Sequence, residues 1–80
     1  MPFKVRAPAE LVGPVKPQTP KWRWLHGLAQ VEWVTNEKRA SIYASERIAN
    51  RALSYSPYPR NADDLDRVEL VRVNGHKERL

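Results

Sequence analysis

The fold of this 80-residue chain is decided by the stretch KWRWLHGLAQVEWV, residues 21–34, which holds all three tryptophans. Basic and aromatic side chains alternate with a period of two at its start, and a β-strand places alternate side chains on opposite faces. A second alternating segment follows His26 and Gly27, a pair typical of a turn. The stretch therefore predicts a β-hairpin with strands at residues 21–25 and 28–35.

The first strand of this hairpin has two chemically different faces. One face carries Trp22 and Trp24, and the other carries Lys21 and Arg23. We expect the aromatic face to build a core and the basic face to meet an acidic partner. Because the chain has one phenylalanine, Trp22 and Trp33 are expected in the core, and Trp24 is the tryptophan most available to a partner.

The segments after the hairpin predict one more strand, a helix and a last strand. Residues 36–39 form a polar turn, and residues 40–44 a short strand with Ile42 and Ala44 on one face. Ser45 is a good N-cap for a helix over residues 46–55, with Glu46 favourable at its positive end. The helix has an apolar stripe that should pack on the sheet, made of Ile48, Ala49, Ala52 and Tyr55.

Residues 67–73 are rich in β-branched side chains and predict the last strand. The expected fold class is α+β: a small antiparallel sheet, the hairpin plus two further strands, packed by one helix. Residues 1–20 hold five of the seven prolines and predict an extended Pro-rich arm with a short edge strand at its start. Residues 21–75 are expected to form the single domain and residues 76–80 a tail.

Composition narrows the functional classes. The chain has no cysteine, so disulfides and thiolate metal ligands are excluded. No apolar run approaches the roughly 20 residues that a membrane-spanning helix needs, so we expect a cytoplasmic protein with no membrane partner. A domain of this size buries little surface, and forming a homodimer would add to it.

The net charge of +5 is unevenly distributed. Residues 1–60 carry ten lysines and arginines against four acidic residues, whereas residues 61–80 carry four against five. A basic surface attracts nucleic acid or an acidic protein face.

The sequence offers no catalytic motif. His26 and His76 lie far apart, without zinc-ligand spacing, and Asp63, Asp64 and Asp66 are more typical of a turn than of a cation site. The glycines are isolated, so no phosphate-binding loop is formed. We therefore expect a non-enzymatic protein without metal or cofactor.

Two candidate binding surfaces remain. The first combines basic residues of the hairpin and the following turn with an exposed tryptophan, namely Lys21, Arg23, Trp24, Lys38 and Arg39, where cations would meet phosphates and an indole could stack on a base. The second is the polar face of the helix, Arg47, Asn50 and Arg51, residue types that read base edges. Tyr58, in the loop after the helix, is a candidate anchor for a protein contact.

Residues 31–49, followed by residues 68–73, resemble small hairpin-helix-strand proteins encoded by bacteriophages and mobile elements, among them anti-CRISPR proteins. The resemblance implies stoichiometric inhibition of a host protein or nucleoprotein complex. The alternative is direct binding of DNA or RNA with little sequence preference. A third class, a subunit of a ribonucleoprotein assembly, would use the Pro-rich arm as a wrapping tail.

Overall fold

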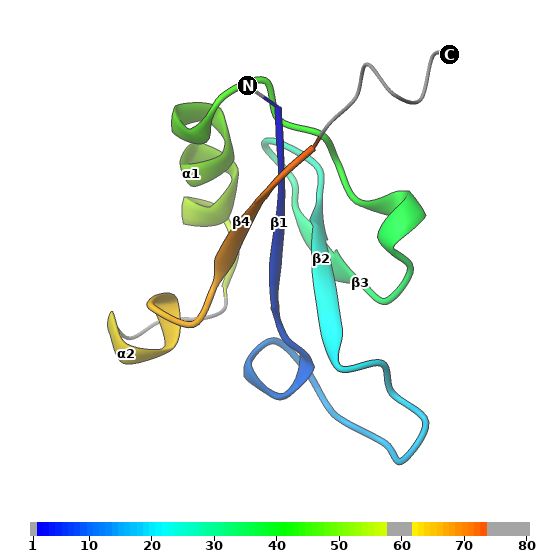
Figure 1. Cartoon of the computed structure of the whole chain (residues 1–80). Coiled ribbons are helices and arrows are strands. Elements are labelled where there is room, and N and C mark those ends of the chain that lie inside the picture. The colour runs from blue at the N-terminus through cyan, green and yellow to red at the C-terminus, as the bar shows by residue number, and fades with distance from the viewer. Residues whose placement is uncertain (1, 58–61, 74–80) are drawn as a thin grey trace.

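The computed structural model of the chain describes residues 2–57 and 62–73. A four-stranded antiparallel sheet of order β3-β2-β1-β4 packs against one main helix, α1, which confirms the expected α+β fold (Figure 1). The elements in chain order are β1 (Phe3–Pro8), η1 (Ala9–Leu11), β2 (Trp22–His26), β3 (Glu32–Val34), η2 (Glu37–Arg39), α1 (Glu46–Ser54), α2 (Ala62–Leu65) and β4 (Glu69–Arg72), where η1 and η2 are 3-10 turns.

The strand expected at the sheet edge, β1, is instead a central strand. Arg6 pairs with Trp24 of β2 on one side and with Glu69 of β4 on the other. The interior of β1 contains no proline, so its N–H groups can serve both neighbours, and Pro8 stands at the strand end, where proline is tolerated. The first part of the Pro-rich arm therefore belongs to the sheet.

The remainder of the arm crosses from β1 to β2; its first residues pack on the domain, whereas residues 14–18 are exposed. Ala9 and Val12 are buried, and the backbone N–H of Ala9 donates to the carbonyl of Lys21. Further on, the chain turns where the N–H of Thr19 donates to the carbonyl of Lys16 at 2.9 Å.

The expected hairpin is formed by β2 and β3, in which Leu25 pairs with Trp33. Its second strand begins at Glu32, however, and not at residue 28. Gly27 has a φ of +106°, and a Cβ there would lie 2.0 Å from the carbonyl oxygen of Gln30. This tight turn takes residues 28–31 out of the ladder, so the connection is longer than the two residues expected.

The strand expected at residues 40–44 is reduced to an isolated bridge between Tyr43 and Phe3. Its facing is also the reverse of the prediction, because Tyr43 is buried whereas Ile42 and Ala44 are exposed. Tyr43 points inward because its hydroxyl donates a hydrogen bond to the carbonyl of Gly27.

The main core lies between the sheet and α1. Its buried members are Val5, Leu25, Tyr43, Ala49 and Ala52, and the partly buried side chains packed on them are Val31, Trp33, Leu53, Val68 and Leu70. The small Ala49 and Ala52 let the helix approach the sheet closely.

Helix α1 begins where the sequence predicts and ends at Ser54, one residue before the expected end. The hydroxyl of Ser45 accepts the N–H of Ile48 and caps the helix. The predicted apolar stripe is only half correct, because Ile48 and Tyr55 are exposed. Leu53 packs on the core instead, because the helix turns Ala49, Ala52 and Leu53 toward the sheet.

The sheet face opposite α1 holds a second cluster around Arg6. Val5 faces α1, so its neighbour Arg6 points to the other side, together with its cross-strand partner Trp24. The guanidinium carbon of Arg6 lies 4.0 Å from the ring centre of Trp22 and 5.7 Å from that of Trp24. Its Nη2 donates to Oε1 of Glu69 at 2.6 Å.

Trp24 is therefore buried, contrary to the expectation that it is the most available tryptophan, whereas Trp22 and Trp33 are only half-buried. The reason is that Trp24 and Leu25 are adjacent in β2 and are buried on opposite faces. A strand covered on both sides has no free aromatic face.

Leu25 is fully buried at the centre of the main core, so we expect Leu25→Ala to lower the free energy of unfolding by about 2–5 kcal/mol. Urea denaturation followed by tryptophan fluorescence measures the change. Val15→Ala is the control, because Val15 is 53% exposed and should change stability by less than about 0.5 kcal/mol. Equal losses in both variants would contradict this account of the core.

Candidate functional site

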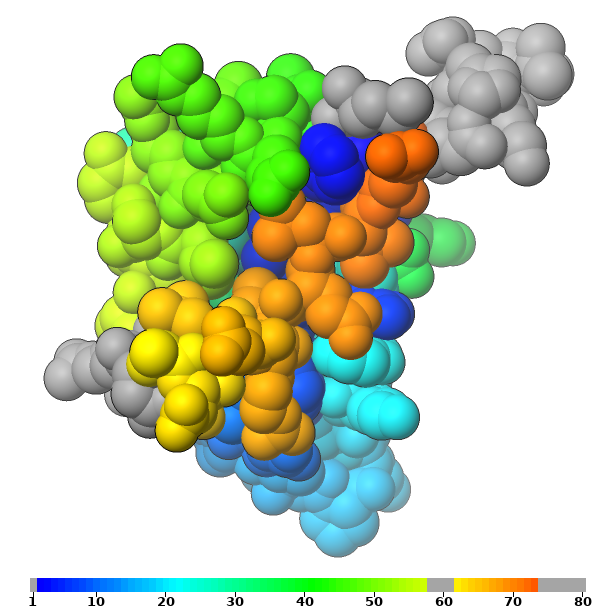
Figure 2. Space-filling view, turned by 60° about the vertical axis from the view of Figure 1, so that its left-hand side comes forward, coloured from blue at the N-terminus to red at the C-terminus, as the bar shows by residue number. Residues whose placement is uncertain are grey.

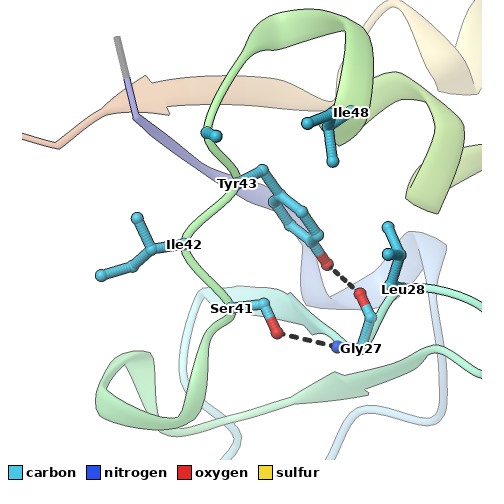
Figure 3. A pocket seen from close by; sticks show the side chains of 7 residues that line it. Gly27, Leu28, Ser41, Ile42, Tyr43 and Ile48 are labelled. Atoms are coloured by element: carbon cyan, nitrogen blue, oxygen red, sulfur yellow. Dashed lines mark hydrogen bonds between the residues drawn. The ribbon is translucent and has the colours of Figure 1, made fainter.

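An apolar groove opens at the end of β2, where three segments meet (Figure 3). The turn after β2, the extended segment before α1 and the first turn of α1 line an open depression of about 480 Å³. We call this site the Tyr43 groove, and its lining residues are Gly27, Leu28, Ser41, Ile42, Tyr43, Ala44 and Ile48.

Hydrogen bonds to Gly27 fix the floor of the groove. The Tyr43 hydroxyl donates to the carbonyl of Gly27 at 2.5 Å, and the Ser41 hydroxyl accepts the N–H of Gly27 at 2.9 Å (Figure 3). Burial raises the pKa of Tyr43 above its ordinary value of 10.0, against a smaller opposing effect of its hydrogen bond with the Ser41 side chain. Both hydroxyls therefore serve to shape the turn.

The walls of the groove are exposed aliphatic side chains. Leu28 is 50%, Ile42 54% and Ile48 37% exposed. Leu28 and Ile48 lie on one side of the Tyr43 ring, and Ile42 points to the other side (Figure 3). These three side chains are therefore the exposed apolar contribution to the groove.

The surface of α1 beside Ile48 is basic. Arg47 precedes Ile48, and Arg51 lies one turn further along the same surface of α1. Both arginines are exposed, and neither makes a salt bridge within residues 2–57 and 62–73. Two like charges four residues apart on a helix repel each other, so the isolated chain retains a small electrostatic cost here.

The acidic residue at the start of α1, Glu46, forms no salt bridge with either arginine among the described residues. Glu46 lies two residues before Ile48, which is about 200° around the helix, on the side away from the groove. The outer surface of α1 forms a broad face beside β4 (Figure 2). Ile48 therefore lies between the apolar lining of the groove and the helix surface that carries Arg47 and Arg51.

The first predicted binding surface is divided by the structure. Lys21 lies 5.8 Å from the Trp22 ring at the start of β2, and Trp24 is buried. Arg23 is half-buried, and its Nη2 donates to the carbonyl of Pro14. These residues do not form one open basic face.

The remaining members of that surface, Lys38 and Arg39, lie at the opposite end of β2. The backbone carbonyl of Arg39 lies 2.7 Å from Nδ1 of His26. The Nη2 of Arg39 lies 3.5 Å from Oε1 of Glu32. β2 is five residues, or about 13 Å, long from Trp22, next to Lys21, to His26, which contacts Arg39.

The residues of the second predicted surface, Arg47, Asn50 and Arg51, all lie exposed on α1. Tyr58 and His76 lie outside the described residues. Within the described part of the chain, which includes Asp63, Asp64 and Asp66, no group of three histidines or carboxylates is placed to hold a metal ion.

Sequence reasoning missed the groove because it assigned Ile42 and Ile48 to the core and Leu28 to a strand. The sequence of residues 41–44 is compatible with burial of Ile42 and Ala44 or with burial of Tyr43. Only the contact of Tyr43 with Gly27, sixteen residues away, decides between them, and no signal within residues 41–44 reports it.

None of the helices among the described residues has the length and apolar character needed to cross a membrane. No protein-family model, curated protein or solved structure matches this chain. The groove and its surroundings are therefore the features from which function is inferred.

Tyr43→Phe removes the hydrogen bond to Gly27, so we expect it to lower the free energy of unfolding by about 1–2 kcal/mol at neutral pH. The loss should also change the alkaline response. Because the folded state holds the Tyr43 proton more tightly than the unfolded state, stability from this group is complete below pH 10 and falls as pH rises through the raised pKa.

Urea denaturation of both proteins between about pH 8 and about pH 11 tests this, since the stability of the wild type should approach that of the variant at the alkaline end. Tyr55→Phe is the control, because Tyr55 is 56% exposed. A constant difference between wild type and Tyr43→Phe at every pH would show that Tyr43 is not protected from ionisation.

Proposed function

We propose that this protein is a non-enzymatic binding protein that attaches stoichiometrically to a protein surface through the Tyr43 groove. The observation that carries the proposal is the exposure of Leu28, Ile42 and Ile48 around one groove, beside two arginines without a described ion pair. Apolar anchors surrounded by charged residues are the usual composition of a protein interface.

The chemistry of the lining supports binding over catalysis. The hydroxyls of Ser41 and Tyr43 are both engaged with the backbone of Gly27, so they stabilise the groove. The other lining side chains are aliphatic.

The target that we propose is a host protein or nucleoprotein complex, inhibited by occupation of its surface. The resemblance of residues 31–49 and 68–73 to phage-encoded inhibitors of the anti-CRISPR type supports this choice. The groove is formed largely within residues 27–48, which overlap the first of these segments.

Paired replacement of Leu28 and Ile42 by serine tests the groove, because both side chains are about half exposed and their loss should leave the core intact. We expect this double variant to lose a partner that the wild type retains from a nuclease-treated bacterial lysate, with at least a tenfold fall in recovery by quantitative mass spectrometry.

Val15→Ser is the matched control, because Val15 is equally exposed but lies outside the groove. It should retain the same partner as the wild type. A partner retained equally by all three proteins would refute the groove as the binding surface.

Direct nucleic-acid binding is the second candidate, favoured by the exposed cluster of Arg47, Asn50 and Arg51 on α1. In this case labelled duplex DNA, single-stranded DNA and RNA should bind at about 50 mM salt and lose most of their affinity by about 200 mM.

The variant Arg47→Glu/Arg51→Glu should then weaken binding to every sequence alike, whereas the double serine variant of the groove should bind as the wild type does. If the charge reversal leaves the affinity unchanged, the α1 surface is not a phosphate-binding site. Fluorescence anisotropy measures both effects.

A further inference from the structure

The open backbone of the Tyr43 groove indicates the conformation of its partner. Phe3 and Tyr43 exchange two hydrogen bonds, of 2.8 and 2.7 Å, so the Tyr43 peptide groups are directed toward β1. In an extended antiparallel segment the neighbouring residues direct their N–H and C=O groups to the opposite side.

The N–H and C=O groups of Ile42 and Ala44 therefore point away from β1. Neither residue makes a backbone hydrogen bond within the described part of the chain. Both residues are exposed, and the chain bends at Ala44 before it enters α1. Residues 42–44 therefore form a short open strand edge inside an apolar groove.

The side chains around this edge match the two faces of an added strand. A strand laid beside residues 42–44 would point alternate side chains to opposite faces. One set would meet Leu28 and Ile48, and the next would meet Ile42, which points the other way (Figure 3). A helix would present its backbone to neither face and would leave this edge unpaired.

The charges near the edge favour a negatively charged partner. Arg47 and Arg51 lie beside Ile48, whereas Glu46 lies around the helix from it. Salt bridges to described acidic residues involve other cations of the chain, such as Arg6 with Glu69 and Arg67 with Glu10. A partner segment with carboxylates would therefore relieve the repulsion between the two arginines.

We propose that the Tyr43 groove binds an extended acidic segment of a partner protein, which adds a short strand beside residues 42–44 and places aliphatic side chains against Leu28, Ile48 and Ile42. This proposal rests on the proposed function and names the chemistry of its partner. Backbone hydrogen bonds to the edge supply register, and the apolar walls and arginines supply selectivity.

The second copy of this chain is the less suitable occupant. A symmetric pair formed through the groove would bring the Arg47 and Arg51 surfaces of two copies together, because a two-fold interface places the same patch on both sides. Like charges across an interface oppose association.

The probe for the test is the blocked heptapeptide Asp-Glu-Val-Ile-Val-Glu-Asp, whose aliphatic centre is flanked by carboxylates. Titration into the full-length isotope-labelled protein, followed by NMR, should shift the amide signals of residues 27–28, 41–44 and 47–51. Replacement of the four acidic residues by lysine should weaken binding by about tenfold or more, because the peptide would then repel the two arginines.

Two further comparisons separate strand addition from apolar contact alone. A heptapeptide N-methylated at its three central residues keeps the side chains but cannot donate to the edge, and it should bind about tenfold more weakly or worse. The variant Arg47→Glu/Arg51→Glu should prefer the lysine peptide, whereas Lys16→Glu, a charge change away from the groove, should leave the preference unchanged.

Equal affinity for acidic and basic peptides, or for the methylated and unmethylated forms, would overturn the proposal. So would a concentration-dependent dimer in light scattering whose NMR shifts map to the groove, or the same shifts on addition of single-stranded DNA. A heptapeptide that does not bind, together with a lysate partner lost on replacement of Leu28 and Ile42, would refute the acidic strand but retain the proposed function.

Discussion

The whole fold depends on the pairing of β1 with two strands at once. This strand joins β2 through Arg6 and Trp24, and β4 through Val5 and Leu70, so it closes a sheet whose other members lie far along the chain. Such long-range pairing costs loop-closure entropy, which two hydrogen-bonded ladders and two buried faces offset. Val5 packs in the core between the sheet and α1, and Arg6 stacks on Trp22 and Trp24 on the opposite face of the sheet. Residues 3–8, at the start of the expected Pro-rich arm, are therefore a structural element of the sheet.

The groove follows from a mismatch in length between β1 and β2. β1 begins at Phe3, but β2 turns away after His26, so Phe3 has no β2 residue beside it. Tyr43 fills that place with two backbone hydrogen bonds. Because only one residue fits before the chain must enter α1, the segment makes a bridge in place of a full strand, and its outer edge remains open. The same geometry that completes the core thus creates the exposed apolar site.

The sequence predicted those elements whose signals are local. Ser45 caps α1 as expected, the hairpin forms, and β4 falls within the β-branched run, because caps, alternation and turns act over a few residues. The prediction failed where distant contacts decide the outcome. The central place of β1, the burial of Trp24 and the inward facing of Tyr43 depend respectively on β4, Arg6 and Gly27. The two helix arginines were identified from sequence, whereas the groove beside them required the fold.

Net charge is a poor guide to the surface of this protein, because its cations have two different fates. Arg6 is stacked on two tryptophans and paired with Glu69, and Arg23 is held by the carbonyl of Pro14. Both guanidinium groups are therefore engaged in contacts within the fold. Arg47 and Arg51 form no salt bridge among the described residues, and both are exposed on α1, the helix that contributes Ile48 to the groove. Their charge is therefore available to a partner, so an acidic segment would be attracted to this surface more than to the arginines already engaged within the fold.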